Sequence, residues 1–211
     1  MRTASGGVAP AARRWWLPAL AAALVLLRAA PAAAQSSWRL EALGLAATPT
    51  QPQLFVDGWG RGLGIGGSLR REFGRRFELG VDAEFVQFTY EGLPDRGEFG
   101  GERRMTRVAM PLRVHLWESA RAGRERLSLQ GSAGWGHQSI AGIFGDGTPL
   151  PVEAQDGLAV TGDFRFSRSL YRGTRWSAGF RYTWFDFDAE SPGHFAFVLG
   201  LEMPLQGSRP H

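Results

Sequence analysis

The chain has 211 residues, 29 of them glycine, and contains neither cysteine nor lysine. Its formal charge of +4 depends on the N-terminal stretch, because residues 1–34 hold four arginines and no acid, and the remainder has 20 basic and 20 acidic residues. A neutral remainder argues against nucleic-acid binding, which needs a net basic surface. The absence of cysteine excludes disulfides, thiol chemistry and cysteine metal sites.

The first 34 residues have the three parts of a secretory signal peptide. Arginines precede a short apolar run over residues 15–27, and three alanines at 32–34 fit a cleavage site for small residues. The apolar run is too short for a good membrane-spanning helix. We therefore expect a signal peptide at residues 1–34 and one mature domain at residues 35–211.

From residue 38 onward, apolar and polar side chains alternate with the period of two that indicates half-buried strands. Eight such segments are expected, each of roughly 10 to 13 residues, a length that suits tilted membrane strands. They cover about residues 38–47, 59–69, 77–85, 107–116, 127–135, 158–167, 176–184 and 195–203. The faces of the first segment cannot be assigned, because it has apolar residues on both parities. The second places a run of glycines, from Gly58 to Gly66, on one face.

The connections between these segments alternate in length. Three are short and rich in arginine, at residues 70–76, 118–125 and 168–174. Four are mostly longer and rich in glycine, proline and acid, at residues 46–57, 90–103, 139–156 and 186–194. Short periplasmic turns and long extracellular loops are typical of outer-membrane barrels, and an even number of strands places both termini in the periplasm.

A soluble sandwich or a lipocalin-like barrel would show the same alternation with its apolar face inward. Two features of the faces favour the membrane version. Large aromatics lie near the ends of the apolar faces, at Trp59, Trp135, Trp176 and Trp184, as interface girdles do. The polar faces mix small residues with opposite charges, as a narrow polar lumen requires. We therefore expect an all-β fold, an eight-stranded antiparallel transmembrane up-and-down β-barrel of the outer membrane.

Two segments carry a family resemblance. They are Met-Pro-Leu-Arg-Val-His-Leu at 110–116 and the aromatic last strand His-Phe-Ala-Phe-Val-Leu-Gly-Leu-Glu-Met-Pro-Leu at 194–205. With the overall patterning of residues 35–211, they resemble the small outer-membrane barrels related to OmpA, OmpX and OmpW, without indicating a subfamily. Such last strands usually end in an aromatic that the assembly machinery reads, whereas here residues 206–211 follow Leu205.

The resemblance implies the partners of an outer-membrane barrel. These are outer-membrane lipid and lipopolysaccharide, with periplasmic chaperones and the barrel-assembly machinery during biogenesis. It implies no cofactor and no nucleic-acid partner. We expect a structural or interaction role rather than an enzyme.

Strand parity directs a set of charged and polar side chains into the lumen. They are Asp82, Glu84, Arg107, Arg113, His115, Gln130, Asp163, Arg165, Arg181 and Glu202. Charges in a low-dielectric interior must be paired, and eight strands leave room for side chains or at most a small ligand. We therefore expect a filled lumen, with a narrow ion or solute path as the alternative. The glycine run either leaves a thin channel or makes room for arginines from across the barrel.

The sequence His137-Gln138-Ser139 suggests a second alternative. A lipid-facing His-x-Ser is similar to the catalytic motif of the outer-membrane lipid A deacylases, in which a histidine base serves a serine nucleophile and a glutamate orients the histidine. Glu153 would be that glutamate. The chain departs from the family pattern, because Ile140 replaces an asparagine and over 70 residues follow the motif. A loop-edge histidine and serine without chemistry is the favoured interpretation.

Alternate carboxylates at Asp186, Asp188 and Glu190 are the remaining candidate site. Such oxygens could share a Ca²⁺ or Mg²⁺ ion and bridge to lipopolysaccharide phosphates. A solvated acidic rim without a metal is favoured, because exposed charge clusters usually face water.

Overall fold

The computed structural model describes residues 38–74, 76–90, 98–119, 125–144, 153–171 and 173–205. The expected signal peptide at residues 1–34, and the expected start of the mature domain at residue 35, lie outside the described residues. So do residues 206–211, which follow the last strand.

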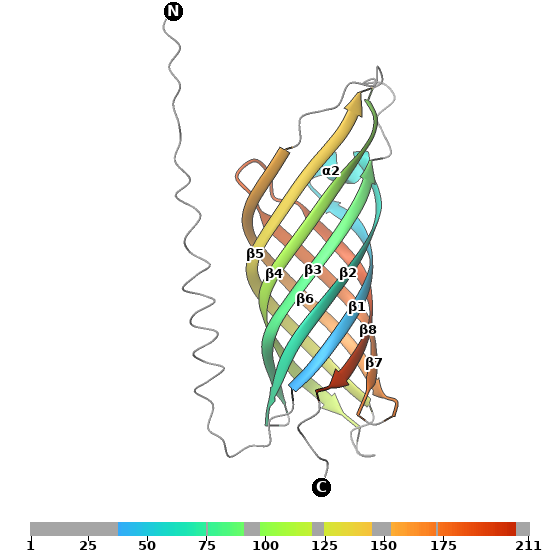
Figure 1. Ribbon diagram of the computed structural model, residues 1–211, viewed down its shortest axis with the longest axis vertical. Coiled ribbons are helices and arrows are strands. Elements are labelled where there is room, and N and C mark those ends of the chain that lie inside the picture. Colours follow the sequence, from blue (N-terminus) through green and yellow to red (C-terminus); the bar gives the residue numbers. More distant parts are fainter. Residues whose placement is uncertain are drawn as a thin grey trace, which may run out of the picture. The chain divides into compact units, whose positions relative to one another are not determined.

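The described residues form a closed barrel of eight antiparallel strands (Figure 1). The strands are β1 (Trp38–Gln51), β2 (Trp59–Phe73), β3 (Phe77–Tyr90), β4 (Glu98–Glu118), β5 (Glu125–Phe144), β6 (Glu153–Ser169), β7 (Arg175–Asp186) and β8 (Gly193–Pro204). Each strand pairs with its neighbours in the sequence, and β1 pairs with β8 to close the sheet. The expected eight-stranded, antiparallel, up-and-down fold is confirmed.

A short helix, α2 (Gln53–Gly58), lies in the connection between β1 and β2, at the end of the barrel where β3 ends and β4 begins (Figure 1). We call this end the loop end and the opposite one the turn end. Within the described residues, no helix combines the length and the apolar character needed to cross a membrane.

Several strands are longer than the alternation indicated. β4 has 21 residues, β5 has 20 and β6 has 17. Their ladder continues through residues expected in loops, so that Glu102 pairs with Ala141 and Arg104 with Ser139. Apolar alternation marks the part of a strand that has an apolar face, whereas backbone hydrogen bonds hold a ladder together whatever the side chains are. The expected loops at residues 90–103 and 139–156 were therefore too long.

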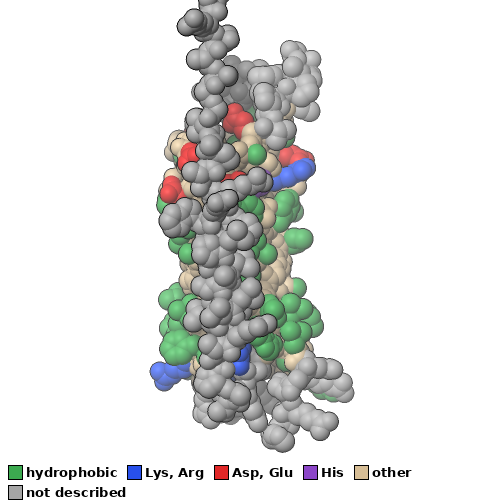
Figure 2. Space-filling model, turned by 60° about the vertical axis from the view of Figure 1, so that its left-hand side comes forward, with side chains coloured by type: hydrophobic (Ala, Val, Ile, Leu, Met, Phe, Trp, Pro, Cys, Tyr) green, Lys and Arg blue, Asp and Glu red, His purple; other side chains and the backbone are tan. Residues whose placement is uncertain are grey.

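The outer wall is apolar and the interior is polar over most of the barrel. Leu63 is 73% exposed and points outward, whereas Glu84 is 4% exposed and points inward. Figure 2 shows apolar side chains over the outer wall and acidic side chains gathered toward the loop end, while the charged side chains visible at the turn end are basic. A soluble lipocalin-like barrel has the opposite arrangement, so that alternative is wrong.

The interior itself has two layers. The structure assigns the faces of β1, with Glu41 and Leu45 directed inward. Charged side chains fill the interior from the turn end to the middle. Toward the loop end lies a buried apolar cluster, which we call the loop-end core: Leu43, Leu45, Ala47, Phe55, Val86, Phe88, Met105, Ala159, Phe185, Phe187, Ala196 and Val198.

Glycines on the inner wall make room for the loop-end core. A Cβ atom on Gly62 would lie 2.6 Å from the ring of Phe88, and one on Gly136 would lie 2.5 Å from the ring of Phe185. Both distances are shorter than real contacts allow, so larger residues would displace these rings. The two expected roles of the glycine run, a thin channel or space for arginines, are wrong at Gly62, because an aromatic ring takes the space.

The apolar outer wall predicts a position-dependent cost for an outward charge. Leu199→Arg places a guanidinium at a 54% exposed position in the middle of β8, and should lower the unfolding free energy in lipid vesicles by about 2–4 kcal/mol. Thr89→Arg, near the loop end of β3, is the matched control and should change it by less than about 1 kcal/mol. Urea titration of both variants provides the measurement; equal effects would contradict the arrangement.

Candidate functional site

All ten side chains predicted to face the lumen lie buried inside the barrel. They are Asp82, Glu84, Arg107, Arg113, His115, Gln130, Asp163, Arg165, Arg181 and Glu202. They come from β3, β4, β5, β6, β7 and β8, on the strand face opposite to the exposed apolar residues. Other buried charges were not predicted from parity, among them Glu41, Arg70 and Glu78.

The middle of the interior is crossed by arginine–carboxylate pairs. Arg165 lies between two acids, with Nη2 2.5 Å from Oδ2 of Asp163 and Nη1 2.6 Å from Oε1 of Glu41. Arg181 also pairs with Asp163, at 2.7 Å, and donates to Glu84. Charge-assisted bonds of this kind, with one guanidinium contacting two acceptors, are among the strongest hydrogen bonds in proteins. They tie β1, β3, β6 and β7 together across the lumen.

Arg107 forms ion pairs between two adjacent strands. Arg107 of β4 contacts Asp82 at 3.0 Å and Glu84 at 3.1 Å, both on β3. It also donates to the hydroxyl of Ser132 at 3.2 Å. Arg107 and Arg181 therefore share Glu84, which connects the ion pairs of Arg107 to those of Arg181 and Arg165.

Toward the turn end, a second group of charges is joined to the first through Glu41. Arg70 lies 2.9 Å from Glu41, 3.3 Å from Glu78 and 3.1 Å from Glu202. Arg113 contacts Glu41 at 3.2 Å and Glu202 at 3.4 Å. Glu41 thus contacts three arginines at once. We call the five arginines 70, 107, 113, 165 and 181 and the six acids 41, 78, 82, 84, 163 and 202 the lumen network.

The lumen network is close to neutral, and each of its charged side chains lies within ion-pair distance of an opposite charge, which lowers the penalty of burying charge. It also fills the cross-section of a barrel whose interior holds little more than side chains. His115 extends the network, with Nε2 3.0 Å from Oε1 of Glu78. The arrangement braces the strands and leaves no carboxylate of the network as a free base.

At the loop end, a smaller polar group covers the loop-end core. The guanidinium carbon of Arg103 lies 4.3 Å from the ring centre of Phe55, a cation–π contact. Arg103 also donates to the side chains of Gln138 and Glu190, and Gln138 donates to Glu190 at 3.1 Å. Arg103, Gln138 and Glu190 are the loop-end polar cluster. Sequence parity offered a signal for Arg103, which has the same parity as Arg107, but the residue lay in an expected loop.

The structure does not assemble the expected His–Ser–Glu group. His137 stacks on Trp135, with ring centres 5.7 Å apart, and its Nδ1 lies 2.9 Å from Oδ1 of Asp156. Glu153 pairs in register with Ile140 instead, so its expected role as the orienting acid is wrong. Ser139 lies further along β5, and within the described residues the structure records no hydrogen bond between it and His137.

The three alternate carboxylates do not converge either. The strand ends at Asp186, Phe187 is buried in the loop-end core, and Asp188 is exposed. Asp186 accepts a hydrogen bond from Ser191 at 3.2 Å, whereas Glu190 turns to Arg103. The described part of the chain holds no cluster of three or more potential metal ligands among its His, Asp and Glu residues. The metal hypothesis at Asp186, Asp188 and Glu190 is therefore wrong as a three-ligand site.

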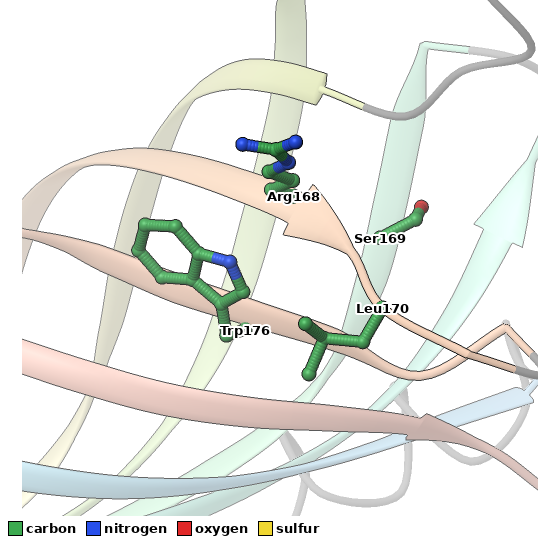
Figure 3. A pocket seen from close by; sticks show the side chains of 4 residues that line it. All are labelled: Arg168, Ser169, Leu170 and Trp176. Carbon is green, nitrogen blue, oxygen red and sulfur yellow. The ribbon is translucent and has the colours of Figure 1, made fainter.

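An open pocket lies on the outer surface at the turn end, lined by Arg168, Ser169, Leu170 and Trp176 (Figure 3). Trp176 packs against Phe166 with ring centres 5.7 Å apart. The exposed guanidinium of Arg168 lies 3.9 Å from Glu125. An indole beside a cation at the edge of an apolar surface is typical of a membrane–water interface.

The closed barrel has known structural counterparts. Neisserial surface protein A (NspA) superposes with a TM-score of 0.59 at 11% identity, over 82% of this chain and 100% of that chain. Ail of Yersinia pestis gives 0.49 at 17% identity, over 80% and 97%. The N-terminal β-barrel domain of Pseudomonas aeruginosa OprF gives 0.43 at 14% identity, over 80% and 100%. No protein-family model and no curated protein matches the chain. The likeness to NspA confirms the expected small-barrel fold.

The position of Glu41 at the centre of the lumen network predicts a large effect of removing its charge. Glu41→Gln leaves its three arginines short of a carboxylate in a buried site, and should lower the unfolding free energy by about 3–5 kcal/mol. Glu102→Gln is the control, because Glu102 pairs with an exposed arginine, and should cost less than about 1 kcal/mol. Similar denaturation midpoints for both variants would show that the network does not stabilise the barrel.

Proposed function

We propose that this chain is an outer-membrane β-barrel protein with a structural or interaction role and a lumen closed to solutes. The observation that carries the proposal is the distribution of side chains, apolar outside and paired charges inside, in a sheet without free edges. A closed barrel satisfies all backbone hydrogen bonds within a bilayer, and the outer wall matches hydrocarbon. Trp176 and Arg168 at the turn end fit the interface on one side of the bilayer.

The orientation of the barrel follows from the lengths of its connections. The first strand begins and the last strand ends at the turn end (Figure 1), so the turn end would face the periplasm and the loop end the exterior. Export would use the signal peptide at residues 1–34, and insertion would use periplasmic chaperones and the barrel-assembly machinery. Outer-membrane lipid and lipopolysaccharide would surround the wall.

The loop end supplies the surface for interactions. β4, β5 and β6 extend beyond the residues that alternate, and raise a rim that displays acidic side chains. Its exposed acids include Asp57, Glu153, Asp156, Asp186 and Asp188. An acidic rim favours basic partners, or lipopolysaccharide phosphates joined to it through divalent cations.

A closed lumen predicts the absence of a steady conductance. The lumen network and the loop-end core occupy successive sections of the interior, so protein reconstituted in a planar lipid bilayer should give no discrete current steps in 1 M KCl. Heat-modifiable migration on a gel would verify that the sample is folded. Regular, ohmic current steps from folded protein would overturn the closed lumen and favour the alternative of a narrow channel.

We also propose that the protein is not a lipid A deacylase, since within the described residues no hydrogen bond joins Ser139 to His137, whose recorded hydrogen bond goes to Asp156. Expressing the chain in a Gram-negative host should leave the mass spectrum of lipid A unchanged. His137→Ala provides the matched control. Loss of one acyl chain with the original protein but not with His137→Ala would contradict this proposal and restore the His-x-Ser hypothesis.

A further inference from the structure

The loop-end core includes one side chain from a helix rather than from a strand of the barrel. Phe55 belongs to α2, in the connection between β1 and β2, yet it is only 1% exposed. Its ring packs edge-on against Phe88, with ring centres 5.0 Å apart, and against Trp59 at 6.4 Å. The interior of the barrel thus contains a space that accepts one benzyl group, and the chain fills that space with its own Phe55.

Few contacts of its own hold α2 in this position. The helix has six residues, its N-cap is Pro52 without a side-chain capping bond, and its first turn has no acid. Short helices without caps are marginal and depend on tertiary contacts. Phe55 is covered by Arg103, and Arg103 is held by Gln138 and Glu190. The Glu190 side chain is partly exposed, so the loop-end polar cluster is open to solvent from one side.

Next to the ring of Phe88 lies a buried histidine, His194, whose ring nitrogens lack a hydrogen bond in the described part of the chain. His194 is fully buried, with the rings of Phe88 and Phe185 5.5 Å and 6.0 Å from its own. Its Nε2 lies 3.7 Å from Oε1 of Glu84, beyond hydrogen-bond distance. Within the described residues, neither of its ring nitrogens makes a hydrogen bond. Buried polar groups nearly always make hydrogen bonds, so an imidazole without one beside an aromatic cluster suits a ligand with one polar group.

We propose that the loop-end core is a binding site for a small monocyclic aromatic molecule that carries a hydroxyl group, and that such a ligand takes the place of Phe55 when the Arg103–Glu190 contact opens. The ring of the ligand would pack against Phe88, and its hydroxyl would point toward His194. The size follows from the benzyl group that the space already accepts: toluene has the shape of a phenylalanine side chain, and p-cresol adds one hydroxyl.

The lumen network closes the site on its inner side, because Glu84 belongs to the network and lies beside His194. A ligand would therefore be held at the loop end rather than conducted through the barrel. This inference goes beyond the proposed function and is independent of it, since binding can be measured on folded protein in detergent whether or not the barrel conducts.

The test titrates p-cresol and toluene into full-chain protein in detergent micelles by isothermal calorimetry. Glu190→Gln weakens the hold on Arg103, and Glu102→Gln is the matched control at an exposed pair. A ligand that binds only the open state has an apparent affinity reduced by the fraction of protein that is open. Because Glu190→Gln should raise this fraction, the variant should bind p-cresol at least threefold more tightly than the original protein. Glu102→Gln should bind p-cresol with the affinity of the original protein. The heat of ligand partition into micelles is the same in every sample and is subtracted.

A second pair of variants tests the role of each ring. Glu190→Gln should bind p-cresol about threefold to tenfold more tightly than toluene, which is the contribution of one hydrogen bond. His194→Phe should still bind toluene but should lose this preference for p-cresol. Phe55→Ala should bind both ligands with one site per chain, even if Glu190→Gln fails to fold. Unsaturable heats in both Glu190→Gln and Phe55→Ala, or a p-cresol preference that persists in His194→Phe, would overturn the proposal.

Discussion

Buried charge must be paired, and this constraint governs the interior of the barrel. Glu41 contacts Arg70, Arg113 and Arg165, all of them buried. Taking these ions out of water is costly unless each finds partners of opposite charge. The partners come from strands far apart in the sequence, so satisfying the charges fixes how β1, β2, β4 and β6 face one another. The outer wall instead requires apolar side chains, because it faces the hydrocarbon of the bilayer.

The two interior layers use different physics to close the same space. Directional ion pairs fill the section from the turn end to the middle, where Arg165 and Arg181 each contact two acids. Non-directional packing fills the loop end, where Phe88 approaches Gly62 on the neighbouring strand and Phe185 approaches Gly136, two strands away. Glu84 and His194 meet at the boundary. These two layers support the proposed structural or interaction role over the alternative of a channel.

Parity predicted the faces of β3 to β8 because the charged residues of each predicted segment all fall on one face of the strand. It failed for β1, whose inward residues include both Glu41 and Leu45, since the strand passes through both layers. The loop-end core was also missed. Phe185 and Val198 lie on the same strand faces as the polar lumen residues. Because the inner face was expected to be polar, these apolar residues were not predicted to form a core. Glu78 was within reach of parity, because it shares the face of Asp82.

The candidate surface sites depended on register, which the sequence does not determine. Whether Asp156 or Glu153 lies opposite His137 is decided by a shift of a few residues across a long connection, and a one-residue slip reverses every face. Similarly, alternate carboxylates converge only while the backbone remains extended, and the strand ends at Asp186. Local spacing therefore identified candidate residues, while tertiary pairing decided their contacts.

A double-mutant cycle between Glu41 and Arg165 tests the central claim, that cross-lumen ion pairing holds the barrel closed. The unfolding free energy would be measured in lipid vesicles for the original protein, Glu41→Gln, Arg165→Met and the double variant. If the pair acts as a unit, the double variant loses less stability than the two single variants combined, by about 1–3 kcal/mol. Additivity within about 0.5 kcal/mol would show that the two charges act independently and would contradict the account.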